Sequence, residues 1–326
     1  MPSRLARLAA VVIALSIAAA ACGRYSISNI RSLKAFQDAN RLYQRTDYKD
    51  AVERYEDSIR LNPDLGFAYF FLGNSYDNMF KPARRGEAEN DAYLEKAAAN
   101  YRIAIEKLKS ASNPKELECR KLSYEYLIAA YGADKLNDFT KAEPVAKDLI
   151  QIEPGEPSNY QLLGRLYEDL GRYEEAEAAY NKAVEIRPSE GLAYSVLAGY
   201  YGRRGEFEKK IQAWYNRSKV EPNNPEAWYS IATEYWDKVY RDKRLVRATS
   251  LEYTKKALVA VDEAIKLNPD YLEAVTYKNI LLRQQALYER EPAVQKNLLD
   301  QADIVQKRQN ELMKKQSAGS EAGKKK

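Results

Sequence analysis

The sequence predicts an all-α protein, a solenoid of about seven helix-turn-helix repeats that ends in a capping helix. The first observation is a residue pattern that recurs with a period of 34, in which each period holds two amphipathic helical stretches. The second is the small number of turn residues, 14 glycines and 12 prolines among 326 residues, which is low for an all-β chain of this length. A chain this long can fold without one large core, because each repeat of a solenoid packs only on its neighbours.

The period is clearest between residues 159–190 and 193–224. Aligning the two segments pairs aromatic, apolar, glycine and proline residues at a constant offset of 34, namely Tyr160 with Tyr194, Leu163 with Leu197, Gly164 with Ala198, Tyr167 with Tyr201, Gly171 with Gly205, Tyr173 with Phe207, Tyr180 with Trp214, and Pro188 with Pro222.

The chemistry of the pattern agrees with a helical pair. Leu163, Gly164 and Tyr167 fall on one helical face at spacings of three and four. The small Gly164 allows a second helix to approach closely, Gly171 supplies the turn between the helices, and Pro188 ends the second one. Each pair leaves an apolar face that only the next pair can cover.

Looser copies extend the array over residues 32–315. Their matching positions are Ala51, Tyr55 and Pro63 in the first repeat, Tyr69, Leu72, Gly73, Tyr76, Ala97, Tyr101 and Ala104 in the second, Tyr126, Ala130, Ala142 and Pro154 in the third, and Trp228, Ile231, Ala232, Tyr235, Ala257, Ala264 and Pro269 in the sixth. A degenerate seventh repeat begins near Tyr271 and is expected to end in a capping helix around residues 302–313. Residues 316–326 are polar and rich in Gly, Ser and Lys, and are expected to lack regular structure.

These residues resemble the tetratricopeptide repeat family, most closely in residues 157–190. The resemblance implies a right-handed superhelix in which the first helix of each repeat lines a concave groove for a protein or peptide partner. Carried over position by position, the family's groove stripe predicts a partner-binding surface formed by Phe36, Asn40, Tyr43, Phe67, Phe70, Asn74, Tyr124, Tyr131, Arg165, Tyr229 and Trp236.

Apolar contact is expected to dominate affinity in this groove. Burying ~100 Å² of an aromatic ring contributes about 2.5 kcal/mol, whereas an exposed ion pair contributes about 0–1 kcal/mol. The alternative is that some of these rings fill the interior of a tight superhelix. Chaperone-binding members of the family hold a terminal carboxylate between Lys and Asn side chains, and Asn40 and Asn74 match those asparagines. Phe36 stands where a lysine is required, so this carboxylate clamp is rejected.

Two repeats carry basic insertions between their helices, at residues 79–91 and 238–250. They could contact an acidic partner or anionic lipid, or simply form charged, solvated extensions of helices and loops.

Residues 1–21 have the composition of a signal peptide. Arg4 and Arg7 precede the apolar run at residues 8–18, which is short for a membrane span. Small residues then precede Cys22, an arrangement that resembles a bacterial lipobox, although Ala19 stands where Leu or Val is usual. We therefore expect an exported protein with a linker at residues 22–31, anchored to a bacterial envelope membrane by lipid on Cys22 and facing the periplasm. The alternatives are simple cleavage with secretion, a mitochondrial-type presequence and a retained anchor.

Composition excludes several classes of function. Histidine is absent, which excludes His-based acid/base catalysis, the Ser-His-Asp arrangement and His-ligated metal. Cys22 and Cys119 lie far apart in the sequence, and no Cys-x-x-Cys spacing occurs, so no structural disulfide or zinc cluster is indicated. The net charge of +5 is too small to predict nucleic-acid binding. No cofactor, metal or catalytic residue is expected.

The sequence as a whole resembles exported bacterial tetratricopeptide-repeat lipoproteins. It predicts a scaffold or adaptor of the cell envelope that binds a protein partner and is not an enzyme. Two alternatives remain, a self-assembling scaffold that stacks through its last repeat, and an envelope hydrolase or ligand carrier that uses paired carboxylates such as Glu174 and Glu175.

Overall fold

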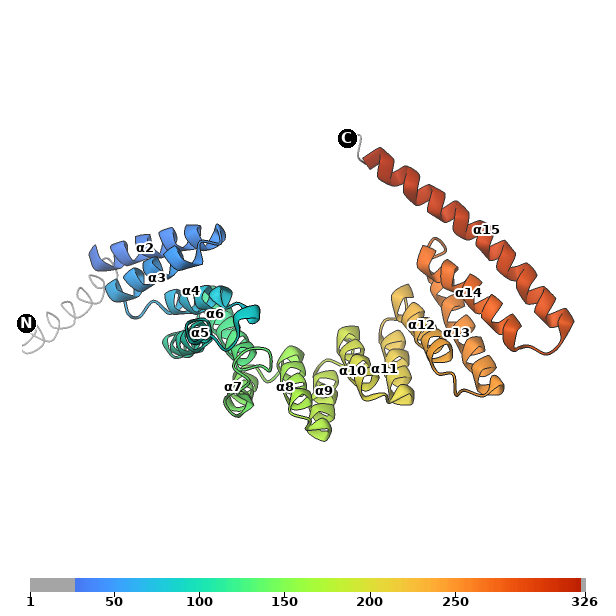
Figure 1. The fold of residues 1–326 in the computed structure, drawn as a ribbon, viewed down its shortest axis with the longest axis horizontal. Helices are drawn as coiled ribbons and strands as arrows, with labels where there is room; N and C mark the ends of the chain where they lie inside the picture. The colour runs from blue at the N-terminus through green and yellow to red at the C-terminus, as the bar shows by residue number, and fades with distance from the viewer. Residues whose placement is uncertain (1–26, 324–326) are drawn as a thin grey trace, which may run out of the picture. The chain divides into compact units, whose positions relative to one another are not determined.

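A computed structural model describes residues 27–323, with side chains up to Ser317. This range contains fourteen α-helices, one short 3₁₀ turn and no strand (Figure 1). The helices are α2 (Ile27–Gln44), α3 (Tyr48–Leu61), α4 (Gly66–Met79), α5 (Ala88–Lys107), α6 (Pro114–Ala130), α7 (Phe139–Ile152), α8 (Pro157–Asp169), α9 (Tyr173–Ile186), α10 (Gly191–Arg204), α11 (Phe207–Val220), α12 (Pro225–Arg241), α13 (Arg247–Leu267), α14 (Leu272–Tyr288) and α15 (Pro292–Gly323). The predicted all-α fold of helical repeats is confirmed.

The chain divides into two compact parts, Met1–Ala176 and Glu177–Lys326. Among the described residues, the N-terminal part holds α2 to α8 with the start of α9, and the C-terminal part holds the rest of α9 with α10 to α15. No helix within residues 27–323 is both long enough and apolar enough to cross a bilayer.

The turn between the two helices of a repeat has the same three-residue pattern in four repeats. A residue with positive φ is followed by a charged residue and then by the aromatic residue that opens the second helix. Glycine takes the left-handed position at Gly171 (φ 71°) and Gly205 (φ 73°), as the sequence predicts. Thr46 (φ 62°) and Asn137 (φ 53°) take the same position in two other repeats.

Alanine and tyrosine form the core of the N-terminal part. Ala51 and Ala97 are fully buried, and the rings of Tyr55 and Tyr101 are fully buried beside them. At Gly73, an added Cβ would lie 3.0 Å from the Tyr101 ring and 3.1 Å from the Ala97 carbonyl oxygen. This glycine therefore permits the close approach of α4 and α5, the role that the sequence assigns to the small residue of the first helix.

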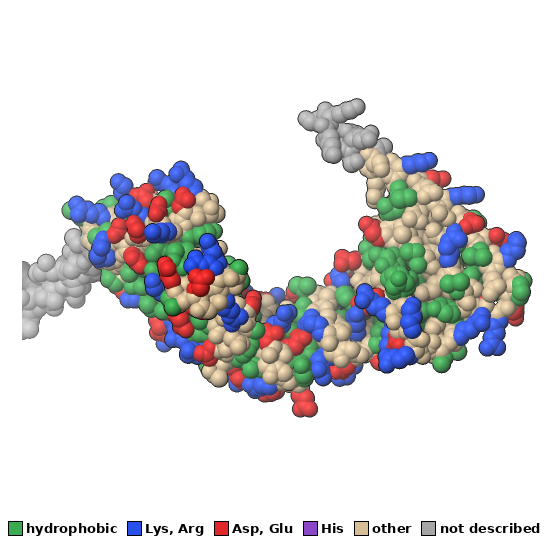
Figure 2. All heavy atoms as spheres, in the orientation of Figure 1, with side chains coloured by type: hydrophobic (Ala, Val, Ile, Leu, Met, Phe, Trp, Pro, Cys, Tyr) green, Lys and Arg blue, Asp and Glu red, His purple; other side chains and the backbone are tan. Residues whose placement is uncertain are grey.

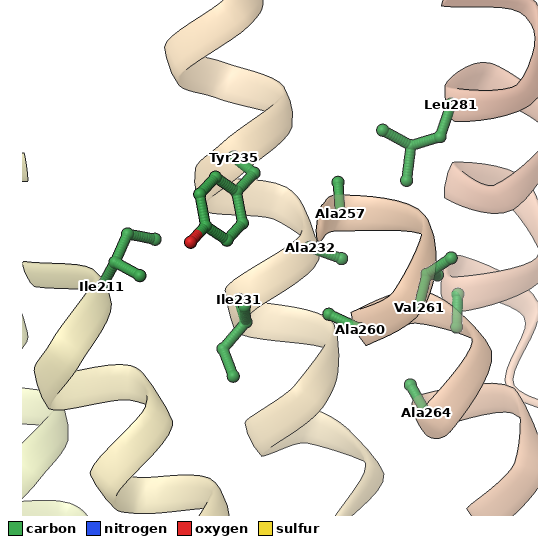
Figure 3. Close-up of a cluster of buried hydrophobic side chains, with 10 residues drawn as sticks. Ile211, Ile231, Ala232, Tyr235, Ala257, Ala260, Val261, Ala264 and Leu281 are labelled. Carbon is green, nitrogen blue, oxygen red and sulfur yellow. The ribbon is translucent and has the colours of Figure 1, made fainter. Parts of the chain in front are cut away.

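The core of the C-terminal part is drawn in Figure 3. Side chains from four successive helices meet there, namely Ile211 from α11, Ile231, Ala232 and Tyr235 from α12, Ala257, Ala260, Val261 and Ala264 from α13, and Ala274 and Leu281 from α14. Because each helix packs on the next one along the chain, apolar burial is continuous without a single central core.

Polar contacts between successive repeats recur with the same period. Glu143 on α7 accepts hydrogen bonds from the hydroxyl of Tyr167 (3.1 Å) and from Arg172 (2.6 Å). Thirty-four residues later, Glu177 accepts from the hydroxyl of Tyr201 (2.9 Å) and from Lys209 (2.9 Å). The second helix of one repeat is thus bonded to the first helix of the next repeat and to the turn or second helix that follows it.

The predicted boundaries need two corrections. The array begins at Ile27, so residues 27–31 of the expected linker are helical. The last helix runs over Pro292–Gly323, so it contains the expected capping helix at 302–313 and most of the tail expected to be irregular. Once a helix has formed, each added residue gains a hydrogen bond at small entropic cost, which allows it to extend through Ser and Gly. Residues 1–26, which include the predicted signal peptide and Cys22, lie outside the described range.

Leu281→Ala tests the repeat core. Leu281 is fully buried against α13, and we expect the substitution to lower the free energy of unfolding by about 2–5 kcal/mol. The matched control is Leu287→Ala on the same helix, where the side chain is 76% exposed and the expected change is within about 0.5 kcal/mol. Urea unfolding followed by circular dichroism measures both. Equal effects of the two variants would contradict this packing.

Candidate partner-binding surfaces

An aromatic cluster occupies the first two repeats of the N-terminal part. Phe71 lies at its centre, with ring centroids 5.8 Å from Phe36, 5.9 Å from Tyr43, 6.0 Å from Tyr55 and 5.1 Å from Phe70. Edge-to-face and stacked arrangements at these distances stabilise the cluster beyond simple burial. The cluster brings together the predicted groove residues Phe36, Tyr43 and Phe70 through a ring, Phe71, that the groove prediction left out.

A hollow of about 390 Å³ lies beside this cluster, between α4 and α6. Its lining is mostly apolar, and Lys115 and Glu118 are the charged residues in it. The other lining residues are Phe67, Phe70, Phe71, Pro114, Cys119 and Leu122. Figure 2 shows hydrophobic side chains reaching the visible surface of the N-terminal part. Since α4 and α6 are the first helices of successive repeats, the hollow lies where the family resemblance places a groove.

The start of α6 sets the register of this wall. Asn113 caps the helix by accepting from the Glu116 backbone N–H (3.0 Å), and Pro114 is the first helical residue. From that start, the spacings of three and four residues place Glu118, Cys119 and Leu122 on the face toward α4.

The predicted polar groove residues of the first two repeats form an internal network. Asn40 accepts from the Tyr55 hydroxyl (2.7 Å), and the Tyr43 hydroxyl donates to the Asn74 side chain. Asn78 also donates to Asn74 (2.8 Å). Asn74 is only 4% exposed, so this network orders α2 and α4 and presents little surface to a partner.

Two predicted groove residues of the third repeat are buried. Tyr124 is 8% exposed and Tyr131 is 1% exposed, so neither side chain offers a binding surface. The groove positions on α6 were predicted from the repeat consensus. The helix begins instead at the Asn113–Pro114 cap, and from that start Tyr126 (38% exposed) lies on the outer face. The sequence does contain a signal for this helix start, with Asn113 as the cap, Pro114 as the first helical residue and Glu116 as an acidic third residue.

Tyr126 and Arg165 lie at the surface. The ring of Tyr126 meets that of Phe70 edge-on at 5.7 Å, and therefore extends the aromatic cluster onto α6. Arg165 on α8 is exposed and pairs with Asp169 (3.6 Å) within its own helix.

The remaining predicted groove residues, Tyr229 and Trp236, belong to the C-terminal part. Both are partly buried against its core and lie in contact with Tyr277 of α14, whose ring centroid is 5.4 Å from each of theirs.

The basic insertions are largely neutralised within the protein. Arg84 pairs with Glu87, Arg241 with Asp237, and Arg244 with Asp242. Arg85 and Arg247 donate to backbone carbonyl oxygens, that of Lys135 (2.8 Å) for Arg85 and that of Tyr288 (2.9 Å) for Arg247. The second insertion mainly lengthens α12 and starts α13. These placements match the interpretation of the insertions as charged extensions of the repeats.

Comparison with known families supports the repeat assignment. Residues 157–190 match the family "Tetratricopeptide repeat". The chain contains a tetratricopeptide repeat. No curated protein matches the sequence.

Several solved structures are similar to this chain. The C-terminal part of a TPR repeat-containing protein from Cytophaga hutchinsonii is 14% identical over 79% of this chain and 97% of its own, with a TM-score of 0.46. A tetratricopeptide repeat protein from Parabacteroides merdae is 16% identical over 83% and 98%, with a TM-score of 0.42. YrrB, described as a TPR protein with an unusual peptide-binding site, is 18% identical over 70% and 98%, with a TM-score of 0.37. At these identities and TM-scores, the similarity carries no information about the binding site of this chain.

Cys119 at the edge of the hollow is expected to be unreactive while the protein is folded. It is 4% exposed, and burial raises the pKa of its thiol to about 12, so very little nucleophilic thiolate forms at pH 8. In a Cys22→Ser protein, a thiol reagent at pH 8 should label Cys119 roughly a hundredfold or more slowly than in urea. Mass spectrometry over time measures the rate, and labelling as fast in the native protein as in urea would contradict the burial.

Proposed function

We propose that this protein is a non-catalytic adaptor that binds an apolar segment of a protein partner in the hollow between α4 and α6. The observation that carries the proposal is the hollow itself, with three phenylalanines of one repeat facing Cys119 and Leu122 of the next. An apolar side chain of a partner that entered it would bury the part of its surface that faces these rings.

The size of the hollow limits the contact. A volume of about 390 Å³ accepts one or two large side chains of a partner and is too small for a folded domain. Lys115 and Glu118 stand at the same wall, where they can meet the polar backbone or charged residues on either side of the inserted side chain. This arrangement fits a peptide segment that presents an apolar anchor.

Energetics favour the rings as the main source of affinity. Covering ~100 Å² of aromatic surface contributes about 2.5 kcal/mol, more than the 0–1 kcal/mol typical of exposed ion pairs. The arginines of the basic insertions already have partners within the protein, so they add little to affinity. Binding at this site needs no movement of the partly buried Asn40, Tyr43 and Asn74 network.

Phe67→Asp tests the hollow. Phe67 is partly exposed at the wall, so the variant should fold, and a carboxylate there opposes entry of an apolar side chain. Peptides selected from a random library against the wild-type protein should bind the variant at least about tenfold more weakly, as expected for the loss of one ring contact. Isothermal titration calorimetry measures the affinities.

The matched control is Leu192→Asp on α10, where the side chain is 60% exposed and outside the N-terminal part. This variant should bind the selected peptides as tightly as the wild type. Selected peptides that bind Phe67→Asp unchanged, or that lose affinity equally in both variants, would refute the hollow as the binding site.

The cellular location that we propose is the bacterial envelope, with lipid on Cys22. Its support is the sequence at 1–22, in which a basic start, an apolar run and small residues precede the cysteine. The first described helix begins at Ile27, so only four residues separate Cys22 from the array. A multi-acyl anchor would then hold the adaptor close to the membrane surface.

Cys22→Ser tests the anchor. In bacteria that express the full-length chain, the substitution should remove the added acyl mass and move the protein from the membrane fraction to the soluble fraction. Cys119→Ser, which changes the other cysteine, should leave both properties unchanged. Intact-mass spectrometry and fractionation give the readout, and acyl mass retained on the Cys22→Ser protein would exclude this site.

A further inference from the structure

Five aromatic rings form a continuous stripe on α12 and α14 in the C-terminal part. The ring of Tyr271 lies 5.2 Å from Tyr229, Tyr229 lies 5.4 Å from Tyr277, Tyr277 lies 5.4 Å from Trp236, and Trp236 lies 5.0 Å from Tyr240. Figure 2 shows hydrophobic side chains gathered on the surface of this part of the protein. We call these five residues the aromatic stripe.

The rings of the stripe are firmly held yet partly open to solvent. Tyr229, Trp236, Tyr271 and Tyr277 pack with part of their surface on the C-terminal core, and none of the four is fully buried. Tyr240 is 57% exposed and stacks on Trp236 with an angle of 11° between the ring planes. Aromatic side chains held in this way lose little conformational freedom when a partner covers them.

Ring orientation changes along the stripe from tilted through edge-on to stacked. Tyr277 meets Trp236 at 81° and Tyr229 at 90°, so the ring from α14 stands between two rings of α12. Tyr229 and Trp236 are seven residues apart, which corresponds to about 10.5 Å along a helix axis. A polyproline II helix repeats every three residues, or about 9.3 Å. Successive turns of such a peptide can therefore meet successive rings.

Hydrogen-bond donors accompany the rings. Burial raises the pKa values of the Tyr229 and Tyr271 hydroxyls, so both stay protonated at neutral pH. The Tyr229 hydroxyl is engaged with that of Tyr277, which leaves the Tyr271 hydroxyl as the donor for a bound segment. A polyproline II peptide has no internal hydrogen bonds, and all its carbonyl oxygens are available to such donors. An α-helical peptide uses its carbonyls internally, and therefore gains less from a stripe that combines rings with donors.

Charge differs between the two ends of the stripe. Glu273 is exposed in the first turn of α14, two residues after the capping residue Tyr271. Its charge acts on the hydroxyls of Tyr271 and Tyr229, and no cation pairs with it among the described residues. At the other end, the Lys243 ammonium lies 4.9 Å from the Tyr240 ring, and it forms no ion pair in the described range. A bound segment with a basic residue at one end and an acidic residue at the other complements these charges.

We infer that the aromatic stripe binds a proline-rich extended segment of a protein, with a basic residue near Tyr271 and an acidic residue near Lys243. Aromatic-lined surfaces that bind polyproline II segments exploit the low entropy of the preformed peptide. The inference rests on the proposed function as a protein-binding array, but it concerns other residues, in the other compact part. The span from Tyr229 to Tyr240 is about 16 Å along the helix, which corresponds to about five residues of polyproline II.

The test uses the capped synthetic peptide Arg-Pro-Pro-Pro-Pro-Pro-Glu, the peptide of reversed order, and a version with glycine for each proline. Calorimetric titration of the full chain should show binding of at least one proline peptide and at least about tenfold weaker binding of the glycine version, because glycine restores the entropy of the free peptide. Trp236→Leu and Tyr240→Ser should each weaken the proline peptide about fivefold or more, and Glu273→Lys should weaken it as well.

The matched control is Tyr173→Ser, which removes a 40%-exposed tyrosine outside the stripe and should leave the affinity unchanged. Tyr240→Ser is an informative variant even if Trp236→Leu proves unstable, because Tyr240 is largely exposed. The inference is wrong if the proline peptides do not bind. It is also wrong if their affinity is unchanged in all three variants, Trp236→Leu, Tyr240→Ser and Glu273→Lys. Binding of a neutral N-acetylglucosamine oligosaccharide in place of the peptides would assign the stripe to glycans instead. Since Phe67→Asp leaves the stripe intact, failure of this test and failure at the α4–α6 hollow are distinguishable.

Discussion

The close approach of neighbouring helices at alanine is the constraint on which the rest of the structure depends. Ala51, Ala97, Ala142, Ala176 and Ala257 occupy the same place on the second helix of five repeats, and each is fully buried. A methyl group at this contact lets the two helices of a repeat pack at short range. In the fifth repeat Lys210 holds this place. The neighbouring residue on the first helix is Gly202, where an added Cβ would lie 3.2 Å from the lysine side chain. A larger residue on one helix is thus offset by a smaller one on the other.

Close packing decides where the large rings go. Each helical contact holds few large side chains, such as Tyr55 and Tyr101, which are fully buried. Other rings keep part of their surface exposed, among them Phe36, Tyr43 and Phe71 in the N-terminal cluster and all five rings of the aromatic stripe. Half-buried rings are already held in place by the core, so covering their outer faces costs little entropy. The constraint that builds the core therefore also produces the candidate binding surfaces.

The sequence was sufficient to predict the helical repeats, because glycine and alanine mark positions where a larger side chain would clash or strain the backbone. Gly73 and Gly171 have the roles that the period assigns to them, a close approach and a left-handed turn. The binding surface was harder to predict. Tyr124 and Tyr126 are two residues apart and chemically identical, yet one is 8% and the other 38% exposed. Which of them faces outward depends on where α6 begins, and that start is set by the Asn113 cap and Pro114. Phe71 and Tyr277 were missed for a related reason, since each completes its cluster only through contact with another helix.

Charge is plentiful on this protein, but most of it is engaged locally. The arginines of both insertions meet carboxylates one to four residues away or carbonyl oxygens at the ends of other helices. A partner that competed for these arginines would have to replace contacts already made, so the net gain in binding free energy is small. Glu273 and Lys243 differ, because both lie beside aromatic rings without an ionic partner in the described range. Where a free charge borders a fixed apolar surface, the rings supply affinity and the charge selects the direction in which a segment binds. The stripe on α12 and α14 meets this condition at both of its ends, which is why it specifies its ligand more narrowly than the hollow between α4 and α6.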